Sequence, residues 1–132
     1  FVVERTIVQM LQGRFVHLGD PTPIRDFEYV DDHVNSYLTC LDNEEAIGEI
    51  FNFCTGHGIS IAHLVESIKK LVGFEGEVIW NAIPDRPLDI AVLVGDYSKA
   101  KRMLGWEPSF TLEEGLGLTI DFWRKKLSEG SP

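Results

Sequence analysis

The sequence has few of the residues and motifs on which metal and nucleophilic sites are built. Its 132 residues include only two cysteines, Cys40 and Cys54, and four histidines. None of these follows an accepted zinc spacing. The two cysteines are typical of buried thiols in a reducing compartment, with a disulfide as the weaker alternative. No serine or cysteine stands in a G-x-S-x-G nucleophile elbow. The sequence therefore predicts neither a metal site nor a hydrolytic nucleophile.

Long apolar runs and positive charge are also scarce. No run approaches the roughly 20 apolar residues of a membrane span, and the opening residues lack a signal-peptide pattern. We therefore expect a cytoplasmic protein. Twelve basic residues stand against twenty-one acidic ones, a net charge of −9. Such a surface repels nucleic acid and anionic lipid. An anionic ligand would therefore need arginines at its binding site to overcome the negative electrostatic potential of the protein.

The hydrophobic periodicity predicts one small α/β domain of short strands and about five helices, spanning residues 1–132. Capping residues mark several helix starts: Asp31, Ser60, Asp96, and Thr111 with Glu114. Helices are expected over 1–12, 31–41, 61–72, 97–105 and 112–127, and strands over 14–20, 25–30, 48–56 and 77–83. In the second helix, the apolar residues expected to face inward are Val34, Tyr37, Leu38 and Leu41.

Two arginines stand in proline-stiffened turns, away from solvated helix faces. Arg25 follows Pro23 at the entrance of a predicted strand, and Arg86 lies between Asp85 and Pro87. A guanidinium offers planar, bidentate donors that suit a phosphate. From the residues alone, however, an arginine beside an aspartate is more often part of a structural ion pair. Both interpretations stay open at this point.

Three ordered segments carry a resemblance to a known family. They are GDPTPIRDFEYVDDHVNSYL, GEIFNFCTGHGISIAHLVESI and DRPLDIAVLVGDYSKAKRMLGWEPSFTLEEGL. Together they cover nearly the whole chain and are similar to the C-terminal part of NAD-dependent nucleotide-sugar epimerases and dehydratases, which are extended short-chain dehydrogenases/reductases. The resemblance implies that this chain is the substrate-binding half of such an enzyme. The Rossmann half would then be absent from it.

The resemblance also implies roles for individual residues. Arg25 and Arg86 match the arginines that contact the nucleotide diphosphate, and Asn52 matches an asparagine that hydrogen-bonds near the phosphates. Val16 and Leu18 match the pair that flanks the base, while Asp89 lies where another substrate-side residue usually falls. Asp26, Tyr29 and Trp106 are assigned to packing and ion pairing. The ligand implied is a nucleotide-diphosphate sugar, and the partner implied is the N-terminal Rossmann domain.

In the family, NAD and the catalytic tyrosine and lysine belong to the N-terminal half. Tyr97 and Lys101 have the spacing of that catalytic pair, but no G-x-G-x-x-G loop accompanies them. A capped surface helix is therefore the favoured interpretation of this pair. We expect no catalytic residue and no bound cofactor on this chain alone.

The function implied is nucleotide-sugar binding within a 4,6-dehydratase or an epimerase, with 4,6-dehydration preferred. A non-enzymatic nucleotide-binding or interaction module is the alternative. The chain starts at Phe1 inside an apolar pattern, which favours a piece of a larger enzyme.

Overall fold

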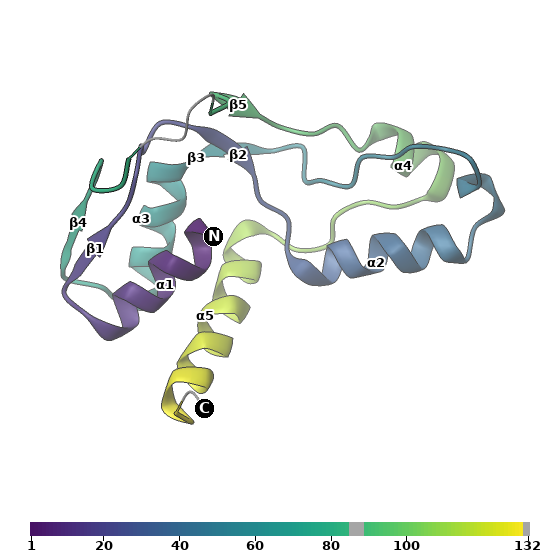
Figure 1. The fold of residues 1–132 in the computed structure, drawn as a ribbon. Coiled ribbons are helices and arrows are strands. Elements are labelled where there is room, and N and C mark those ends of the chain that lie inside the picture. Colours follow the sequence, from purple (N-terminus) through teal and green to yellow (C-terminus); the bar gives the residue numbers. More distant parts are fainter. Residues whose placement is uncertain (85–88, 131–132) are drawn as a thin grey trace. The chain divides into compact units, whose positions relative to one another are not determined.

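The computed structural model describes residues 1–84 and 89–130, and this part of the chain has five α-helices and short strands (Figure 1). The helices are α1 Val2–Gln12, α2 Val30–Leu41, α3 Ile61–Val72, α4 Ser98–Leu104 and α5 Leu112–Ser128, with a 3-10 turn η1 at Glu44–Ala46. The strands are β1 Phe15–His17, β2 Ile24–Asp26, β3 Gly58–Ser60, β4 Glu77–Ile79 and β5 Val92–Leu93. The predicted small α/β fold is thus confirmed.

The chain divides into two compact units. Unit 1 comprises Phe1–Pro23, Ser60–Ala91 and Leu116–Pro132, and unit 2 comprises Ile24–Ile59 and Val92–Gly115. Each unit is built from segments that lie far apart in the sequence. Each unit is therefore held together by tertiary contacts between segments that are distant in the sequence.

Unit 1 is built on the parallel pair β1–β4, in which Val16 lies opposite Val78. Helices α1 and α3 pack against each other, and α1 also contacts β1 (Figure 1). The side chains that form the core come from α1, from β1 and the residue after it, from α3 and from α5: Ile7, Met10, Val16, Leu18, Leu64, Val65, Ile68, Leu116 and Ile120. Burial of this apolar surface is the main stabilising contribution to the unit.

The ends of α3 follow from local chemistry. The hydroxyl oxygen of Ser60 accepts a hydrogen bond from the backbone N–H of His63 at 3.2 Å, which satisfies one of the free donors of the first turn. At the other end, Gly73 adopts a left-handed conformation with φ 74°. Glycine adopts this conformation without a side-chain clash and so ends the helix. Both boundaries were predicted correctly.

Unit 2 contains a three-stranded sheet with strand order β3–β2–β5. Strands β2 and β5 are parallel, with Ile24 opposite Val92 and Arg25 opposite Leu93. Helix α4 contacts η1, and the buried apolar side chains of the unit are those of Cys54, Ala100 and Trp106. Two buried polar residues, Asp32 and Ser36, come from α2. Unit 2 therefore has a small apolar core and depends more on polar contacts.

Two sequence predictions about unit 2 are wrong. The helix over 31–41 exists, but Val34, Tyr37, Leu38 and Leu41 are exposed, and the buried positions are polar. The strand predicted over 48–56 does not form, and the strand of this region is β3, at Gly58–Ser60. In both cases the residues have the expected propensity, but nothing within the described part of the chain covers the helix face or pairs with the segment.

Cys54 is buried and Cys40 is half-buried, and both are free thiols. Within residues 1–84 and 89–130, no cluster of potential ligands could hold a metal ion. None of the helices in those ranges has the length and apolar character that a membrane crossing requires.

Candidate functional site

Strand β2 positions Arg25, the first of the predicted phosphate-binding residues. The guanidinium Nη1 donates a hydrogen bond to the carbonyl oxygen of Ile24 at 2.8 Å, and the residue is half-buried. Parallel pairing with β5 holds the backbone of Arg25 opposite Leu93. The side chain thus leaves the sheet from a fixed point of its backbone.

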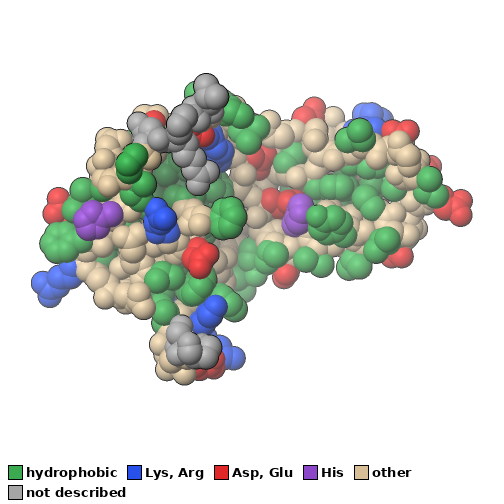
Figure 2. All heavy atoms as spheres, viewed as in Figure 1, with side chains coloured by type: hydrophobic (Ala, Val, Ile, Leu, Met, Phe, Trp, Pro, Cys, Tyr) green, Lys and Arg blue, Asp and Glu red, His purple; other side chains and the backbone are tan. Residues whose placement is uncertain are grey.

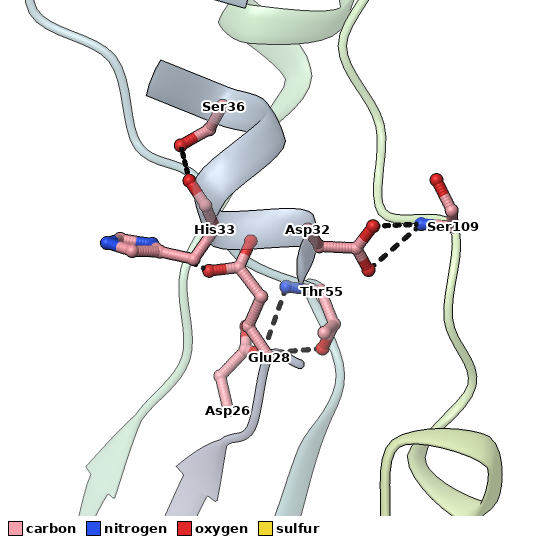
Figure 3. Close-up of polar contacts among 7 residues, drawn as sticks. All are labelled: Asp26, Glu28, Asp32, His33, Ser36, Thr55 and Ser109. Atoms are coloured by element: carbon pink, nitrogen blue, oxygen red, sulfur yellow. Dashed lines mark hydrogen bonds and ion pairs between the residues drawn. The ribbon is translucent and has the colours of Figure 1, made fainter. Parts of the chain in front are cut away.

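Asp26, the next residue, ties three separate segments of unit 2 together, and Figure 3 shows its contacts with Thr55. Its Oδ1 accepts from the backbone N–H of Thr55 at 3.0 Å and from the hydroxyl of the same residue at 2.5 Å. Its Oδ2 accepts from the N–H groups of Gly56 at 2.8 Å and Gly95 at 3.3 Å. A carboxylate that accepts several backbone N–H groups is a strong local anchor. Asp26 therefore positions the loops on both sides of β2.

The two glycines at this anchor are required by the geometry. Gly56 has φ +75°, and the ring of Tyr97 lies 3.5 Å from the position that a Cβ would occupy. A Cβ on Gly95 would lie 2.4 Å from the sulfur of Cys54, which is far inside van der Waals contact. Gly56 is thus required by its positive φ, and Gly95 by the close approach of its backbone to the Cys54 side chain.

Asn52, the second predicted phosphate-side residue, is exposed and belongs to unit 2, like Arg25. It lies in the segment that was expected to form a strand and does not. Arg86, the third, lies outside the described residues. The structure therefore brings Arg25 and Asn52 into one unit, while the predicted convergence of Arg25 and Arg86 stays a prediction.

Val16 and Leu18, the predicted base-flanking pair, lie in unit 1 and are exposed by only 0% and 2%. The N–H of Leu18 donates to the carbonyl of Ile79 at 3.0 Å, and its carbonyl accepts from Ala82 at 2.9 Å. Their side chains are therefore core, and only backbone near them could face a base. His17, between them, is exposed. Asp89 is also exposed and in unit 1.

A cavity of about 430 Å³ in unit 2 was not predicted from the sequence. Its lining combines rings with hydroxyl groups, among them Phe27, Tyr97, Phe110, Thr55, Ser109 and Thr111. Aromatic rings pack on the apolar faces of bases or sugars, and hydroxyls donate or accept hydrogen bonds. One signal was available, since Phe27 is the third residue of the R-D-F motif. Thr55, held by Asp26, connects the anchor to this cavity.

Glu28 and His33 form a further polar pair beside the anchor (Figure 3). Glu28 Oε2 lies 3.0 Å from His33 Nδ1, and its other oxygen is buried without a hydrogen-bond partner in the described part of the chain. Burial raises the pKa of Glu28, and the hydrogen bond to His33 opposes this effect. The pair attaches the start of α2 to the segment that follows β2.

Tyr97 and Lys101 each contact neighbouring side chains of unit 2. The Tyr97 ring packs edge-on against Trp106 at 6.0 Å. The Lys101 ammonium is exposed and bonded to Glu107 at 2.5 Å, and this hydrogen bond raises the Lys101 pKa. Trp106 and Tyr29 were assigned to packing. Trp106 is 2% exposed, and Tyr29 lies 4.7 Å from Phe110 between ring centroids, so both assignments are confirmed.

The fold of this chain is similar to part of several solved nucleotide-sugar enzymes. The UDP-glucose 4-epimerase of Thermotoga maritima, solved with UDP-glucose, superposes with a TM-score of 0.88 at 39% identity, over 96% of this chain and 40% of that one. The UDP-glucuronic acid 4-epimerase of Bacillus cereus, solved with UDP-glucuronic acid and NAD, gives 0.82 at 27% identity, over 95% and 40%.

The sequence comparisons identify the family. UDP-glucuronic acid decarboxylase 1 of Xenopus tropicalis is 35% identical over 127 residues, which are 96% of this chain and 29% of the relative. The profile of the family described as GDP-mannose 4,6 dehydratase matches residues 2–119. The chain belongs to this family of nucleotide-sugar dehydratases and epimerases. It spans about a third of the length of the curated relatives that it matches.

Proposed function

We propose that this chain is the nucleotide-sugar-binding part of an NAD-dependent nucleotide-sugar 4,6-dehydratase or epimerase. Its role is to hold the nucleotide diphosphate and to orient the sugar for chemistry performed elsewhere in the enzyme. Orientation of this kind supplies much of the rate enhancement that proximity gives. The family match over residues 2–119 supports the substrate class.

The proposal depends most directly on the position of Arg25 in β2, next to the anchoring residue Asp26. Its guanidinium leaves a strand whose neighbouring residue, Asp26, anchors two loops through its carboxylate. A positively charged group on such a fixed support is suited to a diphosphate, which the net charge of −9 would otherwise repel. We propose Asn52 and Arg86 as its partners at the phosphates. Asp89 on the substrate side, and the backbone of Val16 and Leu18 at the base, complete the assignment.

NAD fits the intact enzyme better than this chain. The dinucleotide fold needs a strand, a glycine-rich turn and a helix whose N-terminus receives the pyrophosphate. In the described residues, β3 passes directly into α3. The Ser60 hydroxyl oxygen accepts a hydrogen bond from the backbone N–H of His63, in the first turn of α3. No glycine separates the strand from the helix at this junction. We therefore propose that NAD binds the part of the enzyme to which this chain does not correspond, and we assign no catalytic residue here.

Replacement of Arg25 by alanine tests the phosphate assignment. Each charge-assisted hydrogen bond to the diphosphate contributes about 1.5–3 kcal/mol, so Arg25→Ala should weaken UDP-glucose binding roughly 10- to 150-fold. Calorimetric titration of UDP-glucose into the two proteins measures this ratio. The far-ultraviolet circular dichroism of the variant should match that of the parent.

Arg102→Ala is the matched control, since Arg102 is an exposed arginine of α4 in the same unit. Its removal changes the net charge equally and should alter the affinity by less than about twofold. Arg25→Lys should recover only part of the lost affinity, because an ammonium cannot bind a phosphate in a bidentate manner. Equal affinities of the parent and Arg25→Ala would contradict the assignment.

Tyr97→Phe tests whether the Y-x-x-x-K spacing carries chemistry. The Tyr97 ring packs on Trp106, and phenylalanine preserves this contact, so turnover in the complete enzyme should stay within about twofold of the parent. A catalytic acid or base would instead lose on the order of 10²-fold in turnover. Steady-state kinetics of the two enzymes distinguish these outcomes.

A further inference from the structure

A groove in unit 1 lies between helix α3 and strand β4. Its volume is about 580 Å³, which is in the range of ligand-binding sites. One wall is a single face of α3, whose residues are spaced by three and four positions: Ala62, Val65, Glu66 and Lys69. The other wall is formed by residues 75–78 and Trp80. Among the described residues, its lining includes none of those assigned above to the nucleotide sugar.

Strand β4 has a free edge beside this groove. The N–H of Glu77 donates to the carbonyl of Arg14 at 2.9 Å, and the carbonyl of Ile79 accepts from the N–H of Leu18 at 3.0 Å. These two residues of β4 therefore turn their backbone groups toward β1. Successive residues of a strand alternate in direction, so Val78 turns its N–H and C=O away from β1. In the described part of the chain β4 pairs with β1 alone, and Figure 1 shows it as the outer strand of the pair.

The two walls of the groove have similar lengths. From Ala62 to Lys69, α3 extends about 10 Å along its axis. From Gly76 to Trp80, an extended chain covers about 13 Å. Both lengths correspond to about three or four residues of a second extended chain. A helix flank beside a free strand edge is an arrangement that suits the capture of an extended peptide by strand addition.

The two faces of β4 differ in chemistry. On the face toward α3, Val65, which is 2% exposed, and half-buried Val78 give the groove an apolar floor. Glu77 is exposed and lies on the opposite face, where it is in register with Phe15, which is 57% exposed. Figure 2 shows hydrophobic side chains among charged ones over β1 and β4. A strand added at this edge would therefore meet apolar groups with one set of alternate side chains and a carboxylate with the other.

We propose that the edge of β4 and the facing side of α3 bind an extended peptide in which apolar and basic residues alternate, and that the peptide adds to β4 as a further strand. The apolar side chains fill the groove, and the basic ones lie beside Glu77. Glu66 and Glu75 add negative charge to the lining, against Arg14 and Lys69. The net charge of −9 also attracts a cationic peptide, and it disfavours a second copy of this chain as the occupant.

A titration with two synthetic pentapeptides tests the proposal on the complete 132-residue chain. The probe is acetyl-Lys-Val-Lys-Val-Lys-amide, and its matched control has glutamate in place of each lysine. NMR spectra should show saturable shifts confined to β4 and α3, and the Val78 amide should exchange at least about tenfold more slowly with the probe bound. The glutamate peptide should bind at least about tenfold more weakly. Shifts confined to other elements, equal binding of the two peptides, or no saturable shift at millimolar concentration overturns the proposal.

N-methylated peptides distinguish strand addition from a general attraction between opposite charges. In an added strand, every second N–H of the peptide faces β4 and the others face away. Methylation of one alternate set, either the valine or the lysine amides, should abolish the slow exchange of Val78. Methylation of the other set should change the affinity by less than about threefold, because those N–H groups stay in water. Equal losses with both sets, or no loss with either, contradict pairing with β4.

Glu77→Lys reverses the charge beside the groove, and Glu45→Lys makes the same change at an exposed glutamate of η1. Glu77→Lys should reverse the preference between the two peptides, because like charges on neighbouring strands repel. Glu45→Lys should alter either affinity by less than about twofold. An unchanged preference in Glu77→Lys, or the same reversal in Glu45→Lys, overturns the proposal.

Sedimentation of the chain without peptide addresses the second copy. A dimer that the lysine peptide converts to monomer would overturn the proposal in favour of self-association at β4. Arg25→Ala should leave peptide binding unchanged, since Arg25 lies in unit 2 and does not line the groove. The peptide groove and the proposed nucleotide-sugar site can therefore fail independently.

Discussion

Asp32→Ala should lower the free energy of unfolding by about 3 kcal/mol, the larger end of what single substitutions do. The buried carboxylate accepts the N–H groups of Ser109 and Phe110, which precede α5 in the sequence. Hydrogen bonds to a charged group contribute about 1.5–3 kcal/mol each and are not additive when they share one acceptor. Alanine removes the acceptor and leaves both donors unpaired. Urea denaturation followed by tryptophan fluorescence measures the change.

Asp32→Asn and Asp31→Ala complete the design. Asparagine keeps one acceptor oxygen and should lose about half as much stability as alanine. Asp31 is exposed in the same first turn, and its removal should cost less than about 1 kcal/mol through the helix dipole. If Asp31→Ala and Asp32→Ala were equally mild, the buried carboxylate would not hold α2 in place.

Trp106→Ala should destabilise the protein by about 3–5 kcal/mol, the usual cost of removing a large buried aromatic side chain. Trp106 is 2% exposed, and its ring contacts Phe53 edge-on at 4.9 Å and Tyr97 at 6.0 Å. In a unit whose apolar core is small, a cavity of this size cannot be filled by neighbouring side chains. Differential scanning calorimetry, with urea denaturation as a second method, measures the loss.

Trp106→Phe is the informative control, because the indole Nε1 is buried without a hydrogen-bond partner in the described residues. Phenylalanine keeps most of the ring contacts and removes a donor that makes no hydrogen bond within residues 1–84 and 89–130. We expect a cost of only about 1–2 kcal/mol. A cost as large as that of alanine would show that the indole N–H has a partner essential to the fold.

Local chemistry in the sequence was sufficient for the ends of α3 and the start of α5, whereas Asp31, the predicted cap of the second helix, lies inside α2, whose N-cap is Tyr29. Thr111 and Glu114 predicted a capping box, and the structure has it, with the Thr111 N–H and the Glu114 carboxylate 2.8 Å apart. Ser60 and Gly73 predicted the two ends of α3 in the same way. These signals work because each involves groups within three or four residues of one another. The ordered R-D-F, strand and L-G-W segments likewise identified the family correctly.

The orientation of α2 and the conformation of segment 49–53 depend on tertiary contacts, which cannot be read from the sequence. Periodicity shows that α2 has an apolar face, but the side on which that face lies is decided by Asp32 and by Ser109, seventy-seven positions later. Phe51 and Phe53 have strand propensity, but a strand forms only where another segment supplies a hydrogen-bonding ladder. Burial of Val16 and Leu18 was likewise decided by the packing of unit 1. The sequence by itself determined the helices and the family, because those signals are local or ordered along the chain. Only the tertiary structure decided which faces are covered, because burial depends on segments that are distant in the sequence.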